Sequence, residues 1–228
     1  MKEVIYTIPV NEAFDKLDGR CPFCILYDML QSNEIETILG ASMMEPDIRI
    51  KTNELGFCGR HYDMMFERKN RLQLALMLES HLESVSAGIR PGGILSRDAG
   101  QKPVSYITRL ESDCYVCSRI DHSLSKMFET TLLLWSREKE FKNKFDAQKF
   151  FCLPHYRRLM EYARQSLPKG SYSEFVKCAD NIESSYLEAL RADVSHFIRK
   201  FDYRYESEPW GNAKDSVERA LRFLKGEQ

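Results

Sequence analysis

The chain has 228 residues, of which 43% are hydrophobic and 29% are charged. A chain of this length can bury a core without disulfides. Its 33 Lys and Arg side chains balance its 34 Asp and Glu side chains and no basic stripe is present, so the sequence gives no indication of nucleic-acid binding. No segment has the apolar length of a membrane span, and the N-terminal residues lack the apolar run of a secretory signal. We therefore expect a cytoplasmic protein that binds neither nucleic acid nor membrane.

Helical spacing of apolar residues dominates the first half of the chain. An extended lead-in over residues 4–10 is expected to precede a short helix over residues 11–19 and a longer helix over residues 24–39. A polar connection through residues 46–53 then leads to a helix over residues 58–86. The broad apolar coverage of that helix predicts a central, well-covered position.

The second half follows the same plan after a segment rich in Gly and Pro, residues 88–103, which is the strongest loop signal in the chain. The longest periodic segment has no interior Pro or Gly and predicts a helix with one buried face. Trp210-Gly211-Asn212 supplies a turn and an N-cap for a last helix. Helical elements are expected from Cys117 to Trp135, around Phe141 and Phe145, from Cys152 past Tyr162, from Phe175 to Phe201, and after Asn212.

Alternating strand patterns are nearly absent, so the predicted fold is all-α. We expect duplicated helical repeats, each clamped by a Cys3His metal site, that form a helical bundle. The first repeat covers residues 1–87, a Gly/Pro-rich linker covers residues 88–105, and the second repeat, with long C-terminal helices, covers residues 106–228.

Six of the seven cysteines belong to a pattern, CxxC followed by CxxH, that occurs twice. The CxxC pairs begin 93 residues apart and the CxxH pairs 94 residues apart. Three thiols and one imidazole are a ligand set for tetrahedral zinc, so two zinc ions per chain are expected, with the ligands at helix starts. The predicted ligands are Cys21, Cys24, Cys58 and His61 in the first copy and Cys114, Cys117, Cys152 and His155 in the second.

Two other chemistries remain open for these cysteines. An iron–sulfur cluster can also be held by three Cys and one His. Cys21-Pro-Phe-Cys24 alone looks like the dithiol of glutaredoxin-type oxidoreductases, but those follow a strand, whereas a helix is expected here. The seventh cysteine, Cys178, lies among apolar residues at helical spacing and is expected to be a small buried hydrophobe.

Catalytic motifs for nucleophilic, metalloprotease or nucleotide chemistry are absent from the sequence. A closed Cys3His site has no open position for water and stabilises rather than catalyses, so the sequence favours a non-enzyme. Two functions are consistent with it. One is a zinc-stabilised helical scaffold that binds a protein partner, and the other is a thiol-based redox or metal sensor that releases zinc on oxidation.

Five segments of the chain form a distinctive set: Tyr6-Thr7-Ile8-Pro9-Val10-Asn11, Cys21-Pro-Phe-Cys24, the Asp47–Asn53 segment, Gly56-Phe57-Cys58-x-x-His61 and Asn70-Arg71-Leu72-x-Leu74-Ala75-Leu76. With them the chain resembles an uncharacterised family of bacterial proteins, common in Gram-positive anaerobes and known as a domain of unknown function. The resemblance spans both repeats. It implies a bacterial cytoplasmic protein with the same eight ligands and brings no known activity. Some members carry the label of an ABC transporter substrate-binding protein. This sequence does not support that label, because it lacks a two-lobed α/β pattern.

Overall fold

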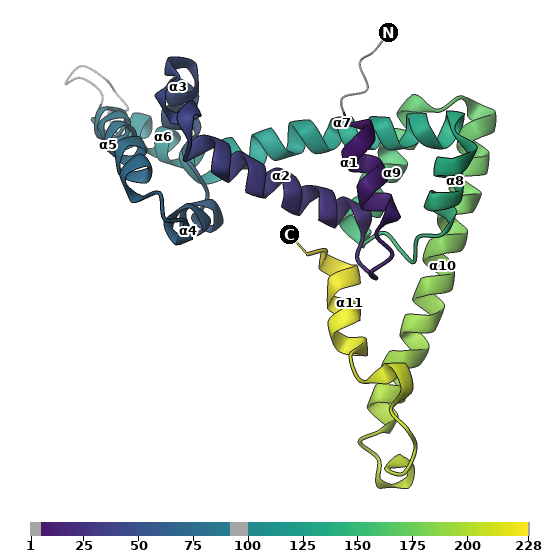
Figure 1. Cartoon of the computed structure of the whole chain (residues 1–228). Helices are drawn as coiled ribbons and strands as arrows, with labels where there is room; N and C mark the ends of the chain where they lie inside the picture. Colours follow the sequence, from purple (N-terminus) through teal and green to yellow (C-terminus); the bar gives the residue numbers. More distant parts are fainter. Residues whose placement is uncertain (1–5, 92–99, 228) are drawn as a thin grey trace. The chain divides into compact units, whose positions relative to one another are not determined.

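Every regular element of the computed structural model is helical over the residues that it describes, 6–91 and 100–227 (Figure 1). The predicted all-α class is confirmed. Three short 3-10 turns, Ala41–Met44, Tyr203–Tyr205 and Gly211–Ala213, complete the described elements. The α-helices are α1 (Thr7–Asp15), α2 (Pro22–Ile38), α3 (Pro46–Leu55), α4 (Gly59–Glu67), α5 (Arg71–Gly88), α6 (Gln101–Ser112), α7 (Tyr115–Arg137), α8 (Lys139–Asp146), α9 (Leu153–Ser166), α10 (Lys169–Arg199) and α11 (Ser216–Lys225).

Proline marks several helix starts. Pro22 opens α2, Pro46 opens α3 and Pro154 is the second residue of α9. These positions suit proline because the first N–H groups of a helix have no partner within it. The same rule explains why the predicted extended lead-in is wrong over residues 7–10. Pro9 is the third residue of α1 and does not interrupt it, while residues 4 and 5 lie outside the described part of the chain.

Two further expectations for the first half are wrong. Residues 46–53 are not a polar connection but most of helix α3. The single helix expected over residues 58–86 is two helices, α4 and α5, separated at residues 68–70. Helix α3 was not predicted because its residues are mostly polar. The break between α4 and α5 was not predicted because the apolar pattern continues across residues 68–70.

Helix α5 is not covered on several sides. It buries Leu74, Met77 and His81, whereas Leu72 and Leu82 are 69% and 63% exposed. The remaining differences concern helix starts. Helix α6 begins inside the predicted linker, whose residues 92–99 lie outside the described residues, and α11 begins after Asp215 rather than after Asn212.

The described chain forms two compact units whose boundary lies inside two helices. The terminal unit comprises the residues up to Asp28 and those from Leu124 onward, and the central unit comprises Met29–Ser123. The chain therefore passes from one unit to the other within α2 and again within α7. These units do not follow the predicted division at residues 88–105, because each contains parts of both repeats.

An aromatic core fills the terminal unit, in which α10 contacts α8, α9 and α11. The ring centroids of Phe23 and Phe128 lie 4.1 Å apart in a stacked pair, and Phe14 meets Phe23 edge-on at 5.8 Å. Both geometries are favourable for aromatic rings. Phe23 lies between two predicted ligands in the sequence, so this core fixes the start of α2.

The central unit is built around contacts of α3, α4 and α6 with α5. Its buried side chains include Phe57, Met65, Leu74 and Met77. Asn70, immediately before α5, donates from its amide to the backbone carbonyl of Leu39 at 3.0 Å. This bond ties the start of α5 to the segment that follows α2.

Glu183 is a buried carboxyl in the terminal unit, 5% exposed. One of its oxygens accepts the backbone N–H of Phe151 at 2.6 Å, and the other has no partner among the described residues. Burial raises the pKa of Glu183 to about 7, although the Phe151 N–H opposes the shift. The folded state thus holds this proton at pH values where the unfolded chain has lost it.

We predict that Glu183→Gln stabilises the protein at pH 8 and has little effect at pH 5. A carboxyl with a raised folded-state pKa loses stability as the pH rises from its unfolded value toward about 7, and the amide removes this loss. The expected gain is about 1–3 kcal/mol at pH 8. Urea unfolding of both proteins at the two pH values measures it. A difference between the proteins that does not change with pH would contradict the role of Glu183.

Candidate metal centres

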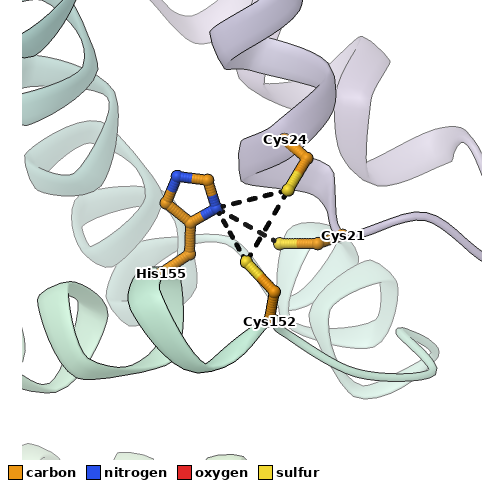
Figure 2. A group of neighbouring side chains, drawn as sticks. All are labelled: Cys21, Cys24, Cys152 and His155. Carbon is orange, nitrogen blue, oxygen red and sulfur yellow. Dashed lines mark hydrogen bonds between the residues drawn. The ribbon is translucent and has the colours of Figure 1, made fainter. Parts of the chain in front are cut away.

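The first candidate centre lies in the terminal unit. Cys21 and Cys24 at the start of α2 meet Cys152 and His155 at the start of α9 (Figure 2). The Nδ1 atom of His155 lies 3.7 Å from the Sγ of Cys21, 3.6 Å from that of Cys24 and 3.2 Å from that of Cys152. The sulfurs of Cys24 and Cys152 are 3.6 Å apart. All four residues are buried, and none is more than 2% exposed.

The second candidate centre lies in the central unit. Cys58 and His61 at the start of α4 meet Cys114 and Cys117 at the start of α7. The Nδ1 atom of His61 lies 3.2 Å from Cys58 Sγ, 3.3 Å from Cys114 Sγ and 3.5 Å from Cys117 Sγ. The sulfurs of Cys58 and Cys117 are 3.9 Å apart. Cys117 is exposed and Cys58 is half-buried, so this group is more open than the first.

The spacing of the donor atoms fits a tetrahedral ion. Zinc–sulfur bonds of about 2.3 Å and zinc–nitrogen bonds of about 2.0 Å give tetrahedral edges of roughly 3.8 Å between sulfurs and 3.6 Å between sulfur and nitrogen. The S–S distances of 3.6 and 3.9 Å bracket the first value, and the N–S distances of 3.2–3.7 Å lie near the second. Both groups can therefore hold a metal ion with little movement of the side chains.

The local chain conformation explains this spacing. In each CxxC or CxxH motif, the first residue stands at the helix boundary and the last in the first helical turn. The backbone N–H of Cys24 bonds to the Cys21 carbonyl at 2.9 Å, and the N–H of His61 bonds to the Cys58 carbonyl at 3.0 Å. Helix N-termini favour thiolates because their N–H groups and dipole face the negative charge. Each centre thus joins the N-terminal turns of two helices.

The pairing of the motifs differs from the sequence prediction. The predicted sets were Cys21 and Cys24 with the first CxxH, and Cys114 and Cys117 with the second. The structure instead joins each CxxC pair to the CxxH pair of the other repeat. The eight residues form two groups of four, but each group draws on both repeats, so neither group lies within a single repeat. The reason is that α2 and α7 each begin with their CxxC pair in one unit and continue into the other unit.

Residues outside the motifs support the terminal-unit centre, and nothing in their spacing identifies them in the sequence. Gly226, which ends α11, is buried with φ of 74°. A Cβ atom there would lie 3.3 Å from Cys152 Sγ and 3.9 Å from Cys24 Sγ. Next to it, Glu227 forms an ion pair with Arg20, which also contacts Asp28 at 2.6 Å. The turn after α11 therefore covers the sulfurs.

The central-unit centre has a different set of supporting residues. The Nε2 atom of His61 lies 2.9 Å from the amide of Gln31, which is 3% exposed, so His61 is held from the side opposite the sulfurs. Gly56 adopts φ of 62°, and its carbonyl accepts the backbone N–H of Tyr115 at 3.0 Å. A Cβ atom on Gly56 would lie 3.3 Å from the ring of His81. This turn links the segment before Cys58 to the start of α7.

The cysteine thiols of the two groups differ in pKa. Hydrogen bonds from Cys152 and Cys21 lower the pKa of Cys24, and burial raises the pKa of Cys21 well above its usual value. At Cys152, the hydrogen bond with Cys21 lowers the pKa, but that with Cys24 and burial raise it to about 12. Although Cys117 is exposed as a residue, partial burial of its thiol and the neighbouring Cys114 and Cys58 thiols raise its pKa to about 12. A metal ion must displace the protons of Cys21, Cys152 and Cys117.

The structure also bears on the other cysteine chemistries. Because Cys21 and Cys24 are buried, a substrate disulfide cannot reach the CPFC dithiol, which argues against the glutaredoxin-like interpretation. Cys178 was expected to be buried, but the structure shows otherwise. It is half-buried, and its Sγ donates to Asp146 at 2.7 Å. Burial and this carboxylate raise its pKa to about 12, which favours the protonated thiol near neutral pH.

The fold and the site define an all-α protein with two Cys3His groups that could hold metal ions. The whole chain, residues 1–228, matches DUF6062, a family of unknown function, and the protein belongs to that family. Searches of curated proteins and of solved structures found no match. Among the described residues, no helix is long and apolar enough to span a membrane. Functional inference therefore depends on the two centres.

We predict that Cys58→Ser releases one metal ion and exposes Cys114 and Cys117, but not Cys21 and Cys24, to alkylation. The reason is the cross-repeat pairing, in which Cys58 shares a centre with the second CxxC pair. Mass spectrometry of alkylated peptides gives the labelling at each thiol. As a control, Cys178→Ser should retain both ions because Cys178 belongs to neither group. Labelling of Cys21 and Cys24 in the Cys58 variant would contradict the pairing.

Metal affinity should rise with pH. Thiols whose pKa lies above the working pH must lose protons before they bind the ion, so acidification favours the metal-free protein. With Cys21 and Cys152 both protonated near neutrality, we expect the apparent affinity of the terminal-unit centre to change by about tenfold or more per pH unit. Competition with a chromogenic chelator at pH 6, 7 and 8 measures this slope, and a flat profile would contradict it.

Proposed function

We propose that the protein is a zinc-stabilised helical scaffold that binds another protein, with both Cys3His groups as structural metal centres. The observation that carries the proposal is the tetrahedral spacing of two complete four-donor groups at helix starts. Three sulfurs and one nitrogen fill all four positions of such an ion, which leaves none for substrate or activating water. The ligand set therefore favours stabilisation over catalysis.

Zinc is the proposed metal because thiolate and imidazole donors in tetrahedral geometry suit it best. The eight ligands would be Cys21, Cys24, Cys152 and His155 in one centre and Cys58, His61, Cys114 and Cys117 in the other. The proposal includes a location in the reducing cytoplasm of a bacterium, where thiols remain available to metal. All seven cysteines are free in the structure, which is consistent with that compartment.

Exposed apolar side chains support a protein partner. Leu72 and Leu76, one turn apart on α5, are 69% and 36% exposed, and Phe66 near the end of α4 is 61% exposed. After α10, Phe201 and Tyr203 are 76% and 85% exposed. Large exposed apolar groups often mark interaction surfaces. The balanced charge of the chain gives no comparable support for nucleic acid.

A second candidate function, a redox or metal sensor, is favoured by one observation. The two centres have the same types of ligand, three Cys and one His, but differ in burial. Cys117 is exposed and Cys58 is half-buried, whereas the four terminal-unit residues are all buried. Cysteine oxidation depends on the accessibility of the sulfur. A sensor would therefore use the central-unit centre.

The metal content of protein purified without added metal or chelator tests the proposed function. Elemental mass spectrometry should find about two zinc ions per chain, since both groups have complete tetrahedral ligand sets. Chelation should lower the helical circular dichroism and the Tm, because the binding energy of structural zinc contributes directly to folding. Iron with acid-labile sulfide would favour a cluster instead. Metal-free protein with an unchanged Tm would refute the proposal.

A further inference from the structure

The two centres offer different access to solvent. In the terminal unit, Cys21 and Cys24 are 2% and 1% exposed and Cys152 is fully buried. In the central unit, Cys58 is half-buried and Cys117 is exposed, although Cys114 is buried like its counterparts. The two groups have the same ligand types and similar donor spacing. The different exposure of their sulfurs to solvent can therefore make the two centres behave differently.

The turn after α11 accounts for the closure of the terminal-unit centre. Gly226 is itself buried and lies so close to Cys152 and Cys24 that a Cβ atom would stand 3.3 Å and 3.9 Å from their sulfurs. Helix α11 is anchored by contacts with α9 and α10, and Glu227 is held by its ion pair with Arg20. An oxidant dissolved in water must displace this turn before it reaches a sulfur.

The accessible sulfurs of the central-unit centre are also close to each other. Cys58 Sγ and Cys117 Sγ lie 3.9 Å apart, and they come from the starts of two different helices, α4 and α7. A disulfide bond is about 2.0 Å long, so these two sulfurs must approach each other by about 2 Å to form one. A thiol bound to a metal is fully deprotonated and therefore remains a nucleophile while it acts as a ligand.

We propose that the central-unit centre is a hydroperoxide-responsive metal switch in which Cys58 and Cys117 form a disulfide and release the ion, while the terminal-unit centre keeps its own. The inference rests on the metal binding of the proposed function and develops its second candidate, the sensor. It adds which centre responds and through which sulfurs. It requires no oxidant beyond a hydroperoxide, for which hydrogen peroxide is the simplest probe.

The reaction proceeds in two steps. The exposed Cys117 thiolate attacks one oxygen of hydrogen peroxide, the O–O bond breaks, and a sulfenic acid and hydroxide form. The Cys58 thiolate then attacks the Cys117 sulfur, the S–S bond forms, and a second hydroxide leaves. Both hydroxides take up protons from solvent as water. Two thiolates lose two electrons in total to the peroxide, and the ion retains only Cys114 and His61 and dissociates.

Peroxide oxidation of the metal-loaded protein tests this order. With about one equivalent of hydrogen peroxide per chain, we expect a metallochromic dye to detect release of one of the two ions. With an excess of peroxide, the first ion should leave about tenfold faster or more than the second. Peptide mass spectrometry should find a Cys58–Cys117 disulfide and unmodified Cys21, Cys24 and Cys152. A thiol reductant with added zinc should restore two ions.

A matched pair of glycine variants tests whether the turn after α11 protects the terminal-unit centre. Gly226→Ala places a side chain against Cys152 in a backbone conformation that disfavours it, so the second ion should leave faster under peroxide. Gly170→Ala is the control, because a Cβ atom there meets nothing within 4 Å. The control should release its second ion at the wild-type rate. Equal release from both variants and wild type would overturn the role of the turn.

The wild-type experiment distinguishes failure of this inference from failure of the proposed function. A protein purified without metal refutes both. A protein that contains two zinc ions but loses them together, loses the terminal-unit ion first, or forms a Cys114–Cys117 disulfide retains its metal centres and refutes only the switch.

Discussion

The joining of two helix N-termini by one group of three sulfurs and one nitrogen is the constraint on which the rest of the structure depends. In the terminal unit it fixes the start of α2 against the start of α9, and in the central unit it fixes α4 against α7. Helix N-termini stabilise thiolates. The pKa values of Cys21 and Cys152 are nevertheless raised, so a cation is needed to stabilise the thiolate forms of these two residues. Folding of each unit and binding of an ion to its group would thus be coupled.

Cross-repeat pairing gives the duplicated motifs an architectural role that neither copy could have alone. Each unit takes its CxxC pair from one repeat and its CxxH pair from the other, and α2 and α7 carry the chain across the unit boundary. The surroundings of the two centres nonetheless differ. Gly226 covers one, whereas Gln31 supports the imidazole of the other and leaves Cys117 exposed. Duplication therefore supplies two equal ligand sets, and their different neighbours determine how each can react.

Much of this arrangement is predictable from the sequence. Apolar periodicity and helix-breaking residues locate α2, α7, α9 and α10, and motif spacing identifies the eight residues that form the two groups. The pairing is not predictable, because either CxxH pair completes the same donor set and spacing along the chain carries no information about direction in space. Helix α3 was missed because its residues are mostly polar, and Gly226 was missed because its contact with Cys152 joins positions far apart in the sequence.

The most direct test of the cross-repeat centres is a proton–cadmium correlation spectrum of the protein loaded with ¹¹³Cd, in which each metal nucleus couples through its bonds to the β-protons of its own cysteines. The account predicts one cadmium signal that correlates with Cys21, Cys24 and Cys152 and a second that correlates with Cys58, Cys114 and Cys117. A signal that joins Cys21 and Cys24 to Cys58 would contradict it and restore a separate centre within each repeat.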